Sequence, residues 1–175
     1  MRRIIFVILV LFLSLPVEAD MTLTGGVDYT GIGDELLHSK PANIPDGYAD
    51  AAFDKQYEEN MACLLNGKTE LTDRTLALFS DGSYGVEYKN LDTPHLIRYY
   101  DKDGKLMNIE LKDGADYPYK TYKYDISGML VNMTYRKSKS ETFIYTPGGK
   151  LLAHWVGPNA YDQYGNVIMT RKYLE

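Results

Sequence analysis

Five copies of one short pattern dominate the sequence between residues 76 and 173. Each copy has an aromatic residue and a turn rich in Asp and Gly, followed in four of the five by a branched apolar residue. Internal repetition at this period predicts a stacked architecture in which no single unit can bury its own apolar face. The copies span residues 79–84, 100–106, 124–130, 145–151 and 161–167.

Each copy predicts a β-hairpin. An Asp at the first turn position, such as Asp101, can accept a hydrogen bond from the backbone N–H two residues on, and a Gly three residues after it closes the turn in the left-handed conformation. We therefore predict a mainly β fold, in which five hairpins over residues 71–175 form an antiparallel meander and a curved open sheet. The turn glycines are Gly82, Gly104, Gly128, Gly149 and Gly165.

The Tyr-Asp-x-x-Gly-x-Leu core of these copies resembles the YD repeats of Rhs-type wall and toxin proteins. The copy at residues 99–106 also resembles MORN-like repeats of the antitoxin type. The resemblance covers about the last hundred residues and not the first half of the chain. It implies an antiparallel β-meander or spiral, with carbohydrate or protein contact as the usual role.

The chain begins with the pattern of a secretory signal. Arg2 and Arg3 precede an apolar run over residues 4–13, and residues 17–19 form a small-residue cleavage site. Because a bilayer-spanning helix needs about 20 apolar residues, we expect no membrane span after cleavage. Residues 1–19 are thus a predicted signal peptide, and the protein is expected to be periplasmic or secreted.

The acidic balance of the chain, with a formal net charge of -5, argues against nucleic acid and anionic membrane surfaces as partners. Cys63 is the only cysteine, so an internal disulfide is excluded and packing must supply the stability.

Residues 20–70 form the expected N-terminal segment. Its first half is glycine-rich, and a loose alternation at Val27, Tyr29 and Ile32 predicts one strand before a loop. A helix is expected at residues 46–66, where Asp46 or Asp50 can cap the start and an Asn-Gly pair can end it. We expect its apolar stripe to cover one face of the sheet. The stripe consists of Phe53, Tyr57, Met61, Leu64 and Leu65.

Alternation along the hairpins predicts two different sheet faces. One is aliphatic and reads as core. Its members are Ile97, Tyr99, Met107, Ile109, Leu111, Val131, Met133, Ile144, Leu152, Val156 and Ile168. The other is aromatic and interleaved with amides and Arg98, an arrangement that suits the C–H faces and hydroxyls of sugar rings. Its candidate binding residues are Tyr100, Tyr122, Tyr124, Tyr145, Trp155, Asn108 and Asn132. The alternative is that the tyrosines only pair across strands and cover the sheet.

The sequence offers little for catalysis or metal binding. His38, His95 and His154 are scattered, with no spacing that would place two on one helix face. Residues 99–110 imitate a calcium loop, but Tyr99 stands at the first ligand position and the flanks alternate like strands. We therefore expect no enzyme, no catalytic or metal-binding residue and no cofactor.

The resulting hypothesis is an exported, non-catalytic binding or interaction module, with cell-envelope polysaccharide as the candidate ligand. One alternative is a structural or toxin-associated module that binds another envelope protein through an exposed edge strand at residues 167–173. The other is a glycoside-active hydrolase, in which two carboxylates about 5 to 9.5 Å apart would converge over the aromatic face.

Overall fold

The computed structural model describes residues 27–41, 44, 52–89 and 95–170. Over these residues, ten antiparallel strands form one open sheet in which every strand pairs with its neighbours in the chain. The predicted mainly β fold built of antiparallel hairpins is therefore confirmed. The strands are β1 (Arg74–Leu78), β2 (Tyr84–Tyr88), β3 (His95–Tyr100), β4 (Leu106–Lys112), β5 (Tyr119–Asp125), β6 (Leu130–Arg136), β7 (Glu141–Tyr145), β8 (Leu151–Val156), β9 (Asn159–Tyr161) and β10 (Val167–Thr170).

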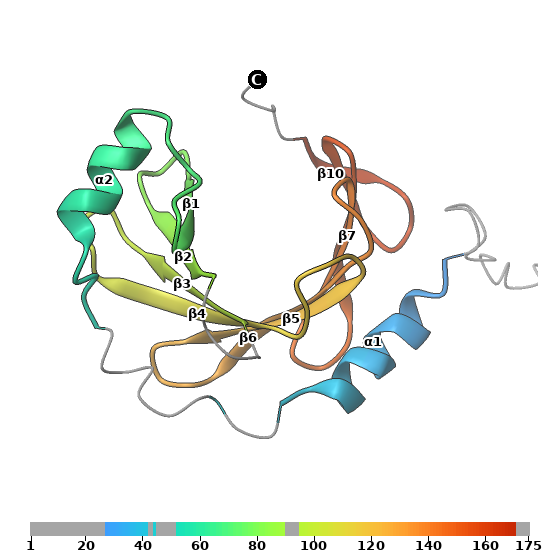
Figure 1. Ribbon diagram of the computed structural model, residues 1–175. Coiled ribbons are helices and arrows are strands. Elements are labelled where there is room, and N and C mark those ends of the chain that lie inside the picture. Colours follow the sequence, from blue (N-terminus) through green and yellow to red (C-terminus); the bar gives the residue numbers. More distant parts are fainter. Residues whose placement is uncertain (1–26, 42–43, 45–51, 90–94, 171–175) are drawn as a thin grey trace, which may run out of the picture.

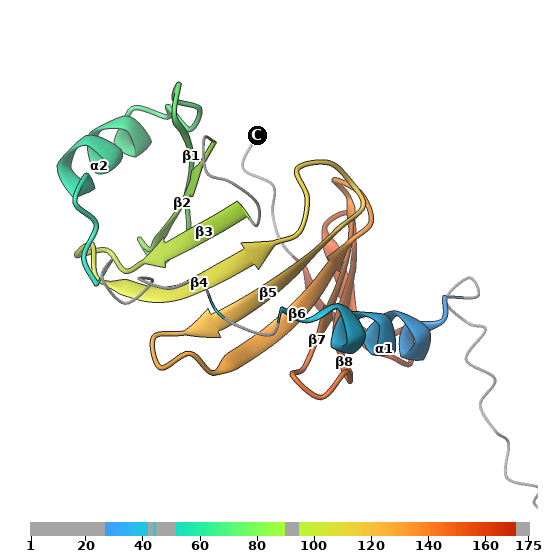
Figure 2. The ribbon, with the colours of Figure 1, turned by 60° about the horizontal axis from the view of Figure 1, so that its bottom comes forward.

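The sheet curves into a U, with β1 and β2 in one arm and β7 to β10 in the other (Figure 1). Two helices, α1 (Tyr29–Ser39) and α2 (Tyr57–Leu65), lie on the outside of the U (Figures 1 and 2). Helix α2 contacts β1, and α1 contacts β6 and β8. We call the helix-bearing side the convex face and the inner side the concave face.

The turns close as the sequence predicts. The five turn glycines all have φ between 79° and 85°. In the β3–β4 turn, Asp101 Oδ1 accepts hydrogen bonds from the backbone N–H groups of Asp103 and Lys105, both at 2.9 Å. Asp125 and Asp162 make the same pair of bonds, and the Thr146 hydroxyl replaces one of them in the β7–β8 turn.

A β-bulge follows four of the five glycine turns, namely those of the β3–β4, β5–β6, β7–β8 and β9–β10 hairpins. In the β3–β4 hairpin, Tyr100 pairs with Leu106 but Tyr99 pairs with Asn108, so Met107 is an extra residue. Such a residue breaks the simple alternation of side chains along a strand. The four extra residues were predicted to lie in the aliphatic core, but they are 37 to 51% exposed and that prediction is wrong. They are Met107, Val131, Leu152 and Ile168.

The predicted division into an aliphatic and an aromatic face is also wrong. Both kinds of side chain share the convex face, where Ile109 pairs with Tyr124 and Leu111 with Tyr122. Ile97, Tyr99 and Ile144, predicted to be core, pair instead with polar residues of the concave face. The bulges cause the error, because each one shifts the parity of the strand that follows its turn.

Helix α1 stands where the sequence predicts a strand and a loop. Asp28 caps it by accepting a hydrogen bond from the Gly31 backbone N–H at 2.9 Å. Gly33 lets the helix approach the β7–β8 turn, because a Cβ at Gly33 would collide with the carbonyl oxygen of Gly149. The two glycines that make the segment resemble a loop thus serve a cap and a close contact.

Helix α2 is shorter than predicted. It begins at Tyr57, and Phe53 instead forms a β-bridge with Lys105. The predicted caps Asp46 and Asp50 lie outside the described residues. The predicted stop is correct, since Gly67 follows the helix with φ of 69°. The apolar stripe is correct only in its middle, because Phe53 and Leu65 are 65% and 76% exposed.

Candidate binding face

The convex face is closed at its β1 end by a buried polar network that anchors α2. Asp54 Oδ2 accepts hydrogen bonds from the Tyr84 hydroxyl at 2.7 Å and from Asn60 Nδ2 at 2.8 Å. Arg74 Nε in turn donates to Asn60 Oδ1 at 2.7 Å. Arg74 also forms ion pairs with Glu59 of α2 and with Asp73. The network is therefore a structural link between α2 and the sheet.

A second link holds α1 at the other end. His154 Nδ1 lies 3.2 Å from the Tyr29 hydroxyl, and its Nε2 lies 3.1 Å from Glu141 Oε1. Glu141 also pairs with Lys137 at 2.9 Å. Burial lowers the pKa of His154 below its usual value, although Glu141 opposes this. The imidazole therefore favours its neutral form, in which one ring nitrogen donates and the other accepts.

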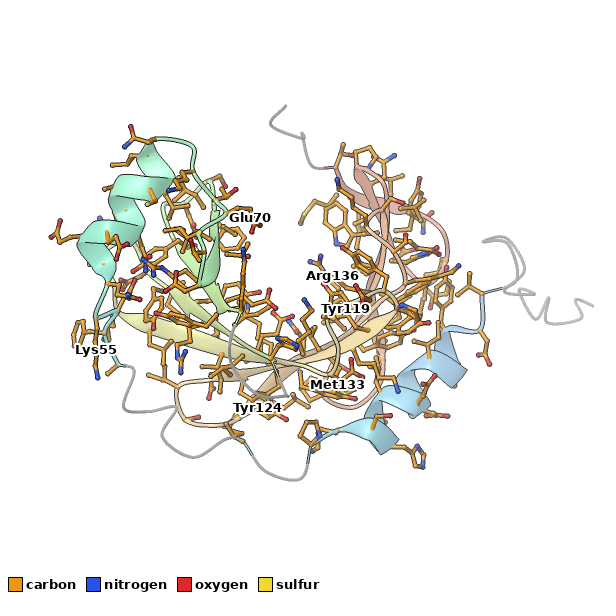
Figure 3. The ribbon with its side chains drawn as sticks, in the orientation of Figure 1. Lys55, Glu70, Tyr119, Tyr124, Met133 and Arg136 are labelled. Atoms are coloured by element: carbon orange, nitrogen blue, oxygen red, sulfur yellow. The ribbon has the colours of Figure 1, made fainter. Side chains whose placement is uncertain are left out.

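Four of the predicted binding residues lie on the convex face and are buried. Tyr100, Tyr122, Tyr124 and Tyr145 are 4, 1, 5 and 0% exposed. Burial raises the pKa of Tyr100 and of Tyr122 to about 12. Figure 3 shows Tyr124 pointing to the outside of the U. These rings are core in this structure and are not accessible as stacking platforms.

The remaining three predicted binding residues lie on the concave face. Asn108 pairs with Tyr99, Asn132 with Lys123, and Trp155 with Thr142. All three are partly exposed. The structure thus divides the predicted site between the two faces and leaves only this part of it open to a ligand.

The concave face combines aromatic rings with cations. Tyr119 and Arg136 point into the hollow of the U (Figure 3). Lys112 Nζ lies 4.5 Å from the centre of the Tyr119 ring and also pairs with Glu87 Oε1 at 3.1 Å. Lys123 Nζ lies 4.0 Å from the centre of the Tyr99 ring. At these distances the ammonium groups are attracted to the ring faces.

Tyr99 also holds an acidic group. Its hydroxyl donates to Glu110 Oε2 at 2.7 Å. Burial and the neighbouring Glu110 carboxylate raise the pKa of Tyr99 above its usual value, so the hydroxyl stays protonated and continues to donate.

A depression of about 440 Å³ opens where the concave face meets the β1–β2 turn. Its two aromatic walls are Phe79 and Tyr99, whose ring centres are 6.0 Å apart at an interplanar angle of 38°. We call it the Phe79 pocket. Its lining residues are Phe79, Ser80, Asp81, Ser83, Tyr99, Met107, Asn108 and Lys123.

Sequence reasoning missed Phe79, Tyr99 and Lys123 as site residues. One signal was available for Tyr99: adjacent residues of a strand point to opposite faces, so the Tyr99–Tyr100 pair must place one ring on each side of the sheet. The sequence does not identify Lys123 as a site residue, because its role depends on whether Glu110 interacts with Lys123 or with Tyr99.

Among the described residues, no three His, Cys, Asp or Glu side chains are grouped so as to hold a metal ion. In the same part of the chain no helix is long and apolar enough to cross a membrane. The predicted signal peptide lies outside the described residues. Comparison of the chain with models of protein families, with curated proteins and with solved structures finds no match. The resemblance to YD and MORN-like repeats therefore stays a prediction.

Proposed function

We propose that the protein is a non-catalytic binding module that takes an extended polymer, a glycan, along the concave face of its sheet. One observation carries this proposal: the side of the sheet without helices presents partly exposed aromatic rings beside amides. Trp155 supplies a ring, and Tyr99 and Tyr119 supply rings that each carry a Lys ammonium group on one face; Asn108 and Asn132 supply the amides. Rings offer stacking area to the C–H faces of sugars, and amides serve their hydroxyls.

The repetition of the fold favours an extended ligand over a compact one. Strands lie about 4.8 Å apart, so equivalent positions on successive hairpins recur at roughly twice that distance. Asn108 and Asn132 are such a pair, since each follows the bulge of its own hairpin. A polymer could engage several weak sites at once, and its overall affinity would exceed that of any one site.

The placement of the acidic groups favours binding over glycoside hydrolysis. On the concave face, Glu87 is paired with Lys112 and Glu110 accepts from the Tyr99 hydroxyl. A glycosidase needs one carboxyl group with a raised pKa and another free to attack or to activate water. If the predicted signal peptide directs export, the ligand would be a polysaccharide of the cell envelope.

A polysaccharide panel tests the proposal, with affinities measured by calorimetry on the chain without residues 1–19. Trp155→Ala should weaken binding about five- to tenfold, because one aromatic contact contributes roughly 1 kcal/mol. Tyr164→Ala is the matched control. It removes a ring that is 69% exposed in the β9–β10 turn, outside the proposed site, and should leave the affinity unchanged. The proposal fails if no polymer binds, or if Trp155→Ala binds as well as the wild type while its fold is intact.

A second candidate function is recruitment of a partner strand at β10. The outer edge of β1 is covered, because Leu76 donates its N–H to the Thr69 carbonyl at 2.7 Å. Within the described residues β10 pairs with β9 alone. Such an edge can accept a strand from another chain. Its three apolar residues are more than half exposed, namely Val167, Ile168 and Met169.

Recovery of an envelope protein with the wild type tests this second function. Met169→Lys should abolish that recovery, because a charge on the edge opposes strand addition. Tyr164→Ala should leave it unchanged. Equal recovery with both variants would count against β10 as the interface.

A further inference from the structure

We propose that the Phe79 pocket binds a sugar ring that carries a carboxylate, and that the Lys123 ammonium group binds this carboxylate. The glycan is then an acidic one. The inference rests on the proposed function and names the ligand class of the same face. The pocket volume of about 440 Å³ lies in the range of small-molecule sites. Four of its lining residues, Phe79, Ser80, Asp81 and Ser83, belong to the β1–β2 turn.

The main observation is that Lys123 has no ion-pair partner among the described residues. Lys123 lies directly opposite Glu110 in the β4–β5 pair, where an ion pair would be expected. Instead, the Tyr99 hydroxyl donates to Glu110 Oε2 at 2.7 Å. The Lys123 ammonium group lies 4.0 Å from the centre of the Tyr99 ring. Lys123 takes part in none of the ion pairs among the described residues.

Tyr99 therefore has two effects on Lys123. Its hydroxyl donates to Glu110, the residue opposite Lys123, and its ring holds the ammonium group at the pocket wall. A cation on a ring face is attracted to it but is not neutralised, so it can still bind an anion strongly. Tyr99 thus positions the charged contact for a ligand, while the neighbouring Phe79 supplies the exposed ring on which the ligand stacks.

The other walls suit a sugar ring. Phe79 is 43% exposed, and its ring is tilted by 38° from that of Tyr99, which makes a corner and not a parallel slot. A corner fits a puckered ring that stacks through one C–H face better than a flat ring that needs both faces covered. Asn108 and Ser80 supply neutral groups for hydroxyls at the rim.

Asp81 is the one acidic residue in the pocket lining. Its Oδ1 accepts from the Ser83 backbone N–H at 3.0 Å and from the Ser83 hydroxyl at 2.6 Å, and these bonds lower the pKa of Asp81. Its charge is thereby directed into the turn. The ligand carboxylate is accordingly expected at the Lys123 side of the pocket.

The experiment compares a linear uronic acid polymer with the same polymer after reduction of its carboxyl groups to alcohols. The wild type should bind the acidic form about tenfold more tightly, because one charge-assisted contact is worth that factor. Lys123→Met should bind both forms with the affinity that the wild type has for the reduced form. Lys139→Met, which removes an exposed charge in the β6–β7 loop, should keep the preference.

Phe79→Ala provides a second variant at an exposed turn position that should fold normally. It should weaken both forms equally and leave their ratio unchanged. Equal binding of the two polymers by the wild type, or a preserved preference in Lys123→Met, would overturn the inference and leave the proposed function standing. Binding of neither polymer would overturn the inference, and the polysaccharide panel would then decide the proposed function separately. Thermal unfolding of each variant checks that the fold is intact.

Discussion

Gly33→Ala is the substitution for which sequence and structure predict opposite results. In a solvent-exposed helix interior the change should stabilise the protein by about 1 kcal/mol, because glycine is the poorest helix former after proline. In α1, however, the added Cβ would collide with the Gly149 carbonyl oxygen and lie 3.2 Å from the Tyr145 ring. Tyr145 is fully buried and Gly149 is fixed in a turn at φ of 80°, so neither can yield easily.

The magnitude follows from these two opposing effects. Overpacking costs about 1 to 3 kcal/mol, and a collision with backbone belongs at the upper end of that range. After the helix propensity gain is subtracted, the net loss should be about 2 kcal/mol. For a domain of this size, that lowers the urea midpoint by about 1 M.

Urea unfolding followed by circular dichroism measures the effect of Gly33→Ala. The control is Asp34→Ala, at the next position of the same helix, where the side chain is exposed and the change should raise stability by a few tenths of a kcal/mol. A midpoint for Gly33→Ala at or above that of the wild type would refute the packing of α1 against the β7–β8 turn.

Three further substitutions test the buried polar groups by the same measurement. Asp54→Ala should cost about 3 kcal/mol or more, since it leaves the Tyr84 hydroxyl and a buried amide without their acceptor; a loss under 1 kcal/mol would contradict this. Tyr145→Phe should be neutral or stabilising by up to about 1 kcal/mol, because among the described residues the buried hydroxyl has no hydrogen-bond partner; a clear loss would reveal one. Burial lowers the pKa of His154, so the unfolded chain binds that proton more readily and wild-type stability should fall as the pH drops below about 6.5. His154→Gln should remove this part of the slope, and an unchanged slope would disprove the assignment.

The hairpins could be predicted from the sequence because their turn chemistry is local. An Asp that accepts from nearby backbone N–H groups and a Gly with positive φ need no tertiary partner, and Asp101 with Gly104 behaves as expected. The bulges could not be predicted in the same way. A bulge is a property of two paired strands, and Met107 is an extra residue only in relation to Tyr99 and Tyr100.

The same limit explains the errors at the helices and at the site. Gly33 reads as a loop residue until the β7–β8 turn is known to pass beside it. Tyr124 reads as an exposed aromatic until the convex face is known to be the packed one. Trp155 lies on the concave face opposite Thr142, so its neighbours differ from those that the parity argument gave it.

Amide chemical shifts, recorded by NMR while a uronic acid polymer is added to the protein, test the central claim most directly. The claim is that a ligand meets the concave face and that the convex tyrosines are core. The perturbed amides should cluster around Tyr99, Lys123 and Trp155, with little change in α1 and α2. Shifts centred on the helices or on β10, with the concave face unaffected, would contradict it.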